Sequence, residues 1–410
     1  MKTGAIIAEY NPFHNGHQYQ IEHFRKTSEL DYVIVIMSGN FTQRGEPAWA
    51  PKHLRTLMAL LGGADLILEL PAYYATGSAS IFAEGAISHL NALNCVDELC
   101  FGCEIDGNLD EHKRKLSQAA DILISEPPVF KDVLSSNLKQ GLSYPAARAA
   151  ALKTLIPDSD ILFQPNNILA LEYMTALKKS HSSIQPVLIQ RQGAGYHDPD
   201  GSHPLASASA LRQVLSSAMP ISSVPGLPKE SLTIIQDNYN VLLPVSLNDF
   251  SSMFAASFMH AGTDLCRYTD MNEELANRMQ HCFNSYTNLS SFLLDIKNKA
   301  YTYSRLCRCA SHILTNQQQT ILSLAKDDGY AYYARILGFR KSATPLLGRI
   351  KQCAHIPMIS KMADYPNHLH GNGKTLMETD IFAADIYRTV LQMKFGRPLK
   401  NEFSEKIVII

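Results

Sequence analysis

The stretch "AEYNPFHNGH", residues 8–17, directly follows the apolar run "GAII", residues 4–7, almost at the start of the chain. The Asn11-Pro12 step disfavours helical backbone at Asn11, so it ends the apolar run abruptly, as where a strand passes into a turn. A helical pattern begins near His17. The order strand, turn and helix therefore predicts the first unit of an α/β fold.

The turn in this unit is suited to binding an anion. The amino end of a helix presents unpaired N–H groups and a partial positive charge. Gly16 lets the backbone approach a ligand, and the imidazoles of His14 and His17 offer further donors to a phosphate. The spacing predicts a nucleotide site at the carboxyl end of the first strand. The alternative is a pair of surface histidines that cap the helix.

Short apolar runs alternate with amphipathic segments through the first two hundred residues. This alternation predicts a parallel sheet wrapped by helices, because parallel neighbours need a crossover long enough to hold a helix. Ligands in such sheets lie at the carboxyl ends of the strands. The predicted strands are residues 4–10, 32–37, 66–71, 97–102 and 185–191.

The Pro-rich stretch "MPISSVPGLPKES", residues 219–231, has almost no periodicity and indicates a domain boundary near residue 225. Beyond it, apolar residues recur at helical spacing. The predicted fold is thus a Rossmann-like parallel-sheet domain, residues 1–225, followed by an all-helical C-terminal domain, residues 226–410.

Composition excludes a uniformly basic polymer binder. The chain has 410 residues, a net charge of −1 and 46% hydrophobic residues. Any nucleic-acid site must therefore be regional. No segment is apolar enough to span a membrane, so we expect a soluble cytoplasmic protein. Cys100 and Cys103 have the CxxC spacing of metal and redox sites, but the motif is isolated, and buried reduced thiols are the better interpretation.

Five segments together resemble the bacterial tRNA(Met) cytidine acetate ligase family, within the HxGH nucleotidyltransferase superfamily. They are "AEYNPFHNGHQYQI", "MSGNFTQRGEPA", "GADLILELP", "PNNILALEY" and "ARILGFRK". The resemblance implies that ATP activates acetate to acetyladenylate, with release of pyrophosphate. The acetyl group then passes to the wobble cytidine of elongator tRNA(Met), giving N4-acetylcytidine. It implies no membrane or DNA partner.

The resemblance also implies which residues bind ATP. They are Ile7, Ala8, Glu9, Tyr10, Asn11, Pro12, Phe13, His14, Asn15, Gly16, His17, Gln18, Tyr19, Gln20, Gly102, Asn166, Asn167, Arg191 and Gln192. Gly102 would let the backbone lie close to the nucleotide, although a glycine that merely ends a strand is the alternative. Asn166 and Asn167 precede a helix that either could simply cap, and the sequence does not distinguish them. Arg191 suits a phosphate or carboxylate.

Two further loops complete the expected catalytic region. Ser38, Asn40 and Arg44 follow the second predicted strand and are candidates for the acetate or tRNA-end pocket, with a solvated loop and a local Arg44–Glu46 pair as the alternative. "ASASALR", residues 206–212, loosely resembles the second signature of nucleotidyltransferases. Its Ser207 or Ser209 would cap a helix while facing the triphosphate oxygens, with simple capping as the alternative. Arg212 would act with His14 and His17 as a catalytic residue that neutralises the leaving pyrophosphate.

Five basic residues lie close together in the second half of the chain: Arg335, Arg340, Lys341, Arg349 and Lys351. We predict that they track tRNA phosphates, with a solvated helical face as the alternative. Mg²⁺ is expected to bridge the ATP phosphates, and no protein metal ligands are predicted. No residue suggests itself as a dedicated base.

Three other functions are compatible with the pattern. One is an adenylyltransferase of the same superfamily that acts on a small metabolite, although such chains are usually shorter. Another is a synthetase-like protein that charges an amino acid, although no Lys-Met-Ser-Lys-Ser-like loop is present. The third is a non-catalytic protein that binds tRNA or a nucleotide. Acetate-dependent release of pyrophosphate would distinguish the proposed ligase from the first and the third.

Overall fold

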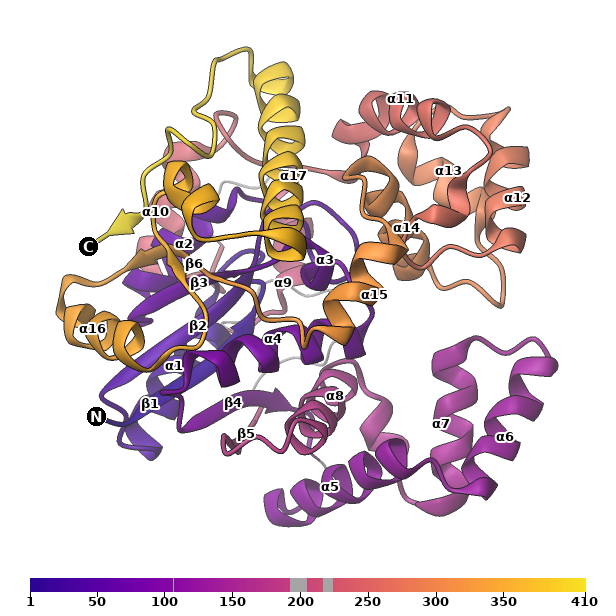
Figure 1. Cartoon of the computed structure of the whole chain (residues 1–410), viewed down its shortest axis with the longest axis horizontal. Coiled ribbons are helices and arrows are strands. Elements are labelled where there is room, and N and C mark those ends of the chain that lie inside the picture. Colours follow the sequence, from indigo (N-terminus) through magenta and orange to yellow (C-terminus); the bar gives the residue numbers. More distant parts are fainter. Residues whose placement is uncertain (106, 192–204, 217–223) are drawn as a thin grey trace.

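The computed structural model describes residues 1–105, 107–191, 205–216 and 224–410. At its centre, the described residues form one eight-stranded sheet in the order β5-β4-β1-β2-β3-β6-β7, with β8 beside β6 (Figure 1). The strands are β1 (Thr3–Ala8), β2 (Tyr32–Ser38), β3 (Leu66–Leu70), β4 (Glu98–Cys103), β5 (Gln185–Gln190), β6 (Ala334–Phe339), β7 (Met358–Ile359) and β8 (Val408–Ile409). All five predicted strands are present.

The neighbours among β1 to β5 pair in parallel. Their carboxyl ends therefore meet at one edge of the sheet. Strand β1 lies between β2 and β4. The turn that follows β1 contains the HxGH motif, residues 14–17, and we call it the HxGH turn; it therefore lies near the centre of that edge. The residues of β2 and β3 are almost all buried, as expected for parallel strands covered on both faces.

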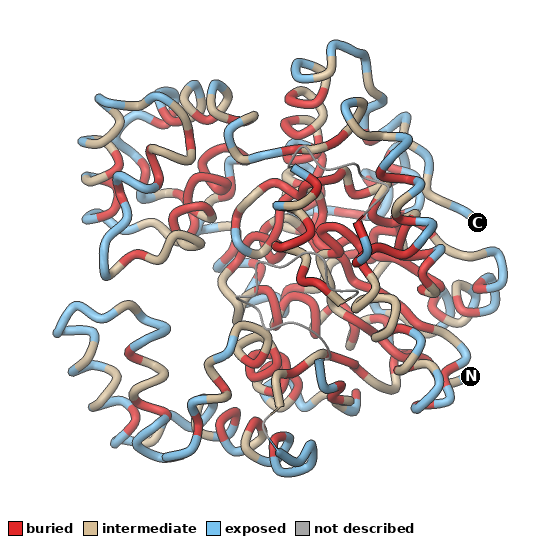
Figure 2. Tube along the Cα trace, turned by 180° about the vertical axis from the view of Figure 1, so that it is seen from behind, coloured by how far each residue is buried: buried red, intermediate tan, exposed pale blue. Residues whose placement is uncertain are grey.

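Helices cover both faces of the sheet. One apolar cluster joins the sheet to α4 and α8, and another joins its opposite face to α1, α2 and α9. Figure 2 shows these buried layers as a continuous red centre. The helices of this part are α1 (Asn15–Thr27), α2 (Lys52–Leu61), α3 (Ala72–Ala75), α4 (Ala79–Leu93), α8 (Pro165–Lys179), α9 (Ala208–Leu215) and α10 (Lys229–Asn238).

Two groups of helices extend from the same side of this central body (Figure 1). The first is α5 (Leu109–Ser125), α6 (Pro128–Lys139) and α7 (Tyr144–Leu155). The second is α11 (Ser251–Ala261), α12 (Glu273–Phe283), α13 (Leu289–Ile296) and α14 (Tyr303–Leu314). The later helices α15 (Gln319–Asp327), α16 (Thr344–Cys353) and α17 (Gly371–Phe395) contribute to the apolar cluster of the central body. The group α11–α14 has its own aromatic core, which includes Phe254, Phe258 and Phe292.

The predicted α/β fold with a helical C-terminal region is confirmed, with one difference. Residues 334–339 are not helical but form β6, which pairs antiparallel with β3. The six residues "ARILGF" are apolar apart from Arg335 and are nearly all buried, as expected for a strand inside a sheet. Strands β7 and β8 add to β6. The second half of the chain thus completes the sheet that the first half begins.

The CxxC pair lies within β4 as buried thiols. Cys100 belongs to one of the two apolar clusters and Cys103 to the other, so they face opposite sides of the sheet. Two thiols arranged in this way cannot bind one metal ion. Burial raises the pKa of the Cys100 thiol to about 12, which keeps it protonated. Among the helices of the described residues, none is long and apolar enough to cross a membrane.

Candidate active site

The HxGH turn at the end of β1 is built from the two histidines themselves. His14 is the N-cap of α1, and its Nδ1 accepts a hydrogen bond from the Gly16 amide at 3.1 Å. The His17 Nδ1 in turn accepts one from the His14 amide at 3.3 Å. The two rings stack with their centroids 3.6 Å apart. The histidines therefore do cap α1, but His14 is buried and not on the surface as the alternative supposed. The capping fixes both rings at the positive end of α1.

Both imidazoles are neutral in this setting. Burial, together with the nearby cations Arg191 and Arg212, lowers the pKa of His14 to about 3. Burial and the neighbouring His14 hold the pKa of His17 well below its usual range. Because each Nδ1 accepts a hydrogen bond, the single proton of each ring resides on Nε2. The pair thus offers two neutral N–H donors.

Some of the remaining residues of the predicted ATP loop hold the turn in place, and others bond only within α1. Tyr10 and Phe13 are buried, and the Tyr10 ring packs edge-on against His17 at 4.8 Å. The Asn11 side-chain oxygen accepts a hydrogen bond from the Trp49 amide at 2.7 Å, which ties the turn to the next loop. Gln18 instead bonds to Glu22 on the same helix at 2.8 Å. The anchors hold the turn in place beneath the histidines.

A second loop, residues 39–47, follows β2 and folds over the end of β1. The Gln43 amide donates to the Glu9 carboxylate at 2.6 Å, and the Gln43 side chain donates to the Gly77 carbonyl at 3.2 Å. Gly45 has φ +80°, and a Cβ there would fall 2.2 Å from the Arg308 backbone nitrogen on α14. The loop is therefore packed between the nucleotide turn and the helical group α11–α14.

The candidates in and beside this loop differ in what they can reach. Ser38 is fully buried at the end of β2. The Asn40 side-chain oxygen accepts a hydrogen bond from the Lys52 amide at 3.0 Å, at the start of α2. Arg44 is exposed, and it lies close enough to Glu9 to act on the pKa of that carboxyl. Of the three, Arg44 alone presents a charged group outward.

Arg55 is a residue that sequence reasoning missed. It is fully buried, and its guanidinium donates to four backbone carbonyls, those of Glu9, Ser38, Gly39 and Ala50. Burial lowers its pKa to about 10, so it remains cationic at neutral pH. It therefore fastens together the carboxyl ends of β1 and β2. The sequence does carry one sign of this role, because Arg55 is a charged residue on the apolar face of the helical segment "KHLRTLMALL".

On the far side of β1, the predicted residues after β4 and β5 do meet. The Arg191 guanidinium donates to the Asn166 side-chain oxygen at 3.2 Å. A Cβ at Gly102 would lie 3.3 Å from the Arg191 side chain, so Arg191 passes closely over that glycine. Asn167 is fully buried. Its side-chain nitrogen donates hydrogen bonds to the backbone carbonyls of Glu104 and Ile161, each at 2.7 Å.

This arrangement separates the two asparagines. Asn167 uses its amide to hold the chain after β4, whereas the Asn166 side chain bonds to Arg191 and to the Glu104 carboxylate. We therefore favour Asn166 as the nucleotide contact and Asn167 as its support. Gln192, the last member of the predicted set, lies outside the described residues.

Arg212 on α9 reaches the HxGH turn. Its guanidinium donates to the Asn11 carbonyl at 2.7 Å and to the Ser209 hydroxyl at 3.2 Å. Ser207 caps the helix, since its hydroxyl accepts a hydrogen bond from the Ala210 amide at 3.2 Å. The structure thus brings together at one edge His14, His17, Asn166, Arg191 and Arg212, from segments far apart in the sequence.

The basic residues predicted to track tRNA are not one surface. Arg335 is 4% exposed and pairs with Glu69 at 2.8 Å and with Glu402. Its assignment as a phosphate contact is therefore wrong, because buried carboxylates already neutralise it. Arg340 donates to the carbonyls of Leu60 and Ala64 at 3.0 and 3.1 Å.

The other members of this basic set lie nearby. Arg349 donates to the Met1 carbonyl at 2.5 Å, while Lys341 and Lys351 are exposed. Because β6 runs antiparallel to β3, its carboxyl end and Arg340 lie at the amino edge of the parallel strands, opposite the HxGH turn. Contact of these residues with RNA stays a prediction.

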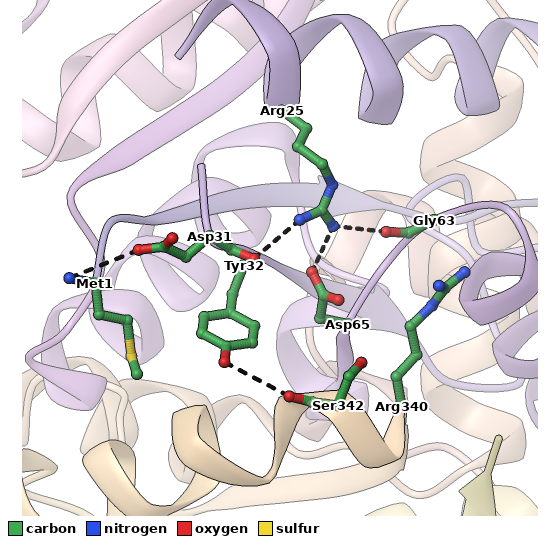
Figure 3. A pocket seen from close by; sticks show the side chains of 8 residues that line it. All are labelled: Met1, Arg25, Asp31, Tyr32, Gly63, Asp65, Arg340 and Ser342. Carbon is green, nitrogen blue, oxygen red and sulfur yellow. Dashed lines mark hydrogen bonds and ion pairs between the residues drawn. The ribbon is translucent and has the colours of Figure 1, made fainter. Parts of the chain in front are cut away.

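The cavity of about 710 Å³ shown in Figure 3 also lies at that amino edge. Its charged groups bond to one another or to the backbone. Arg25 pairs with Asp65 at 2.5 Å and donates to the Asp31 carbonyl at 3.0 Å, and the terminal ammonium of Met1 lies 3.6 Å from the Asp31 carboxylate. It is separate from the candidate active site.

Comparison with known proteins agrees with this geometry. Residues 1–402 match the model of the HIGH Nucleotidyl Transferase family. A tRNA(Met) cytidine acetate ligase of Clostridium perfringens is 38% identical over 94% of this chain and 95% of its own. The enzyme of that name from Acetivibrio thermocellus is 35% identical over the full length of both chains.

Solved structures give the same result. Thermotoga maritima TmcAL in its apo form has a TM-score of 0.91 and is 29% identical over the full length of both chains. The same protein bound with alpha-thio ATP has a TM-score of 0.90, covering 100% of this chain and 99% of its own. The resemblance predicted from the sequence is thus confirmed, and the chain belongs to the tRNA(Met) cytidine acetate ligases of the HIGH nucleotidyltransferase family.

Proposed function

We propose that this protein is an ATP-dependent ligase that converts acetate to acetyladenylate and transfers the acetyl group to the wobble cytidine of elongator tRNA(Met). The observation that carries the proposal is the pair of neutral, stacked histidines at the start of α1, with Arg191 and Arg212 beside them. This arrangement suits a triphosphate, and the fold is one whose relatives bear the ligase name and whose structural neighbour is bound with an ATP analogue.

In the first step, a carboxylate oxygen of acetate attacks the α-phosphorus and pyrophosphate leaves. The reaction needs alignment and stabilisation of negative charge more than proton transfer. His14 and His17 would donate Nε2–H to the phosphate oxygens, and Arg212 would neutralise charge on the departing pyrophosphate. Asn166 and Arg191 would hold the nucleotide beyond Gly102. Arg44 would pair with the acetate carboxylate from the 39–47 loop.

In the second step, the exocyclic amine of cytidine attacks the acetyl carbon and AMP leaves. The base must leave the anticodon stack to reach the site, as readers of RNA loops generally require. The 39–47 loop joins the reacting edge to α14 through Gly45, so the helical group α11–α14 borders this edge. This proximity supports a tRNA-binding role for residues 226–410, with residues 1–225 as the catalytic part.

Mg²⁺ would accompany ATP at this site. Among the described residues, no group of three His, Cys, Asp or Glu side chains could hold a metal ion. The ion would take its oxygens from the phosphates and from water and would offset their negative charge. The roles of the protein residues in both steps do not depend on it.

Incubation with ATP, labelled acetate and tRNA(Met) tests the proposal. Label on the anticodon cytidine is the expected result. Label on AMP alone would indicate an acyl-activating enzyme with another acceptor. No acetate-dependent pyrophosphate release would refute the ligase and favour either an adenylyltransferase for another small metabolite or a non-catalytic binding protein.

A further inference from the structure

Transfer of the acetyl group releases a proton for which the histidines are unsuited. When the cytidine amine attacks the acetyl carbon, its nitrogen gains positive charge and must lose a proton. His14 and His17 already carry a proton on Nε2, and each Nδ1 is occupied by a backbone N–H. Their lowered pKa values also disfavour a second proton. A proton acceptor must therefore come from elsewhere in the site.

Glu9 is placed to take this role. It follows the last residue of β1 and comes two residues before Asn11, whose carbonyl binds Arg212. One carboxylate oxygen accepts the Gln43 amide at 2.6 Å, which aims the side chain between the HxGH turn and the 39–47 loop. Among the described residues, no hydrogen bond engages the other oxygen, Oε2, and the side chain is only partly buried. That oxygen is open to a substrate.

The surroundings of Glu9 act on its affinity for a proton in opposite directions. Burial raises the pKa of the carboxyl, which makes it a stronger base than an ordinary glutamate. Three cations oppose this effect, namely Arg212 on α9, Arg44 in the 39–47 loop and Arg55 on α2. Tyr173 on α8 also lies within electrostatic reach, and burial raises its own pKa above its usual range, so it remains neutral.

We propose that Glu9 is the general base of the acetyl-transfer step. The amine nitrogen forms its bond to the acetyl carbon, the bond from that carbon to the adenylate oxygen breaks, and AMP leaves with the electron pair. The proton lost by the amine passes to Oε2 of Glu9. The inference rests on the proposed function and adds a catalytic residue to its second step. Acetate activation involves no such proton, so Glu9 is not needed as a base there.

Glu9→Gln tests the proposal with little change of shape, because the Gln side-chain oxygen can still accept the Gln43 amide. Because Glu9 belongs to the predicted ATP loop, acetate-dependent exchange of pyrophosphate into ATP is measured alongside, and its rate should fall far less than the rate of acetyl transfer. Transfer from preformed acetyladenylate to tRNA(Met) should slow about 10²- to 10⁴-fold, the usual contribution of a general base. Wild-type transfer should rise with pH until the carboxyl is ionised, and the variant should lack this rise.

Glu9→Asp serves as the conservative control and should restore part of the transfer rate together with the pH dependence. Equal losses of exchange and transfer, with the wild-type pH profile retained, would mean that Glu9 only positions the loop. Wild-type transfer by Glu9→Gln would also overturn the proposal. If the wild-type protein itself shows no acetate-dependent exchange, the proposed function fails instead, so the two failures are distinguishable.

Discussion

Glu402→Gln should destabilise the folded chain far more than a typical charge substitution. Glu402 is 8% exposed and lies among Lys52, Glu69 and Arg335, which are 1%, 5% and 4% exposed. Lys52 Nζ lies 2.8 Å from both Glu69 and Glu402. The four charges cancel, so removing one carboxylate leaves two buried cations with a single partner. Breaking a buried pair in this way costs about 3–5 kcal/mol, a large share of a typical stability of about 5–15 kcal/mol.

A double-mutant cycle in urea measures this coupling. The single tryptophan, Trp49, is buried and reports unfolding by fluorescence. Lys52→Met alone should cost a similar amount, whereas Lys52→Met with Glu402→Gln leaves the neutral Glu69–Arg335 pair. The double variant should therefore be at least about 2 kcal/mol more stable than the sum of the singles predicts. Additivity within about 0.5 kcal/mol would refute the reasoning.

A matched control and a pH series sharpen the test. Glu378 pairs with Lys374 on the surface of α17, where both side chains are about half-exposed. Glu378→Gln should change stability by less than about 1 kcal/mol.

The neighbouring cations depress the pKa of Glu402 in the folded state. Its contribution is therefore present above about pH 4.3, the unfolded value, and is lost as the pH falls further. The Gln variant should lack this loss.

The remaining predictions concern the site. His14→Ala and His17→Ala should each abolish acetate-dependent pyrophosphate exchange while leaving tRNA binding, measured by filter retention, largely unchanged; weakened tRNA binding would contradict their assignment to the triphosphate. Arg212→Ala should lower the exchange rate about 10²- to 10³-fold, and a near-normal rate would exclude it from charge stabilisation. Arg44→Ala should raise the acetate KM with ATP binding intact, which unchanged kinetics would contradict. Because the folded pKa of His14 is depressed to about 3, stability should fall as the pH drops from about 6.5 towards that value, more so than in His14→Gln; parallel curves would contradict a neutral His14.

The features that could be predicted from the sequence are local ones. Strands β1 to β5 are short apolar runs bounded by turn residues, and the HxGH turn combines a strand end with a helix start within residues 8–17. Ser207 as an N-cap and Cys100 as a buried thiol likewise depend on immediate neighbours. These patterns indicate structure because their partners are only a few residues away.

The features that escaped prediction depend on partners far along the chain. Lys52 and Glu402 are 350 positions apart, so nothing local indicates that Arg335 is neutralised inside the protein. The carbonyls that Arg55 binds come from the ends of two strands and from the loop beyond them. Asn166 and Asn167 are adjacent and chemically identical, and only the fold around Glu104 distinguishes them.

The antiparallel strand β6 has a consequence for how the protein is made. Until residues 334–339 leave the ribosome, one edge of β3 has no partner strand. Until residue 402 follows, Lys52 lacks one of the carboxylates that neutralise it. An open edge of this kind invites pairing with other chains. The boundary near residue 225 stays a prediction, and the two parts that it would separate share one sheet. A fragment ending there should need a chaperone or a complementing C-terminal fragment to stay dispersed.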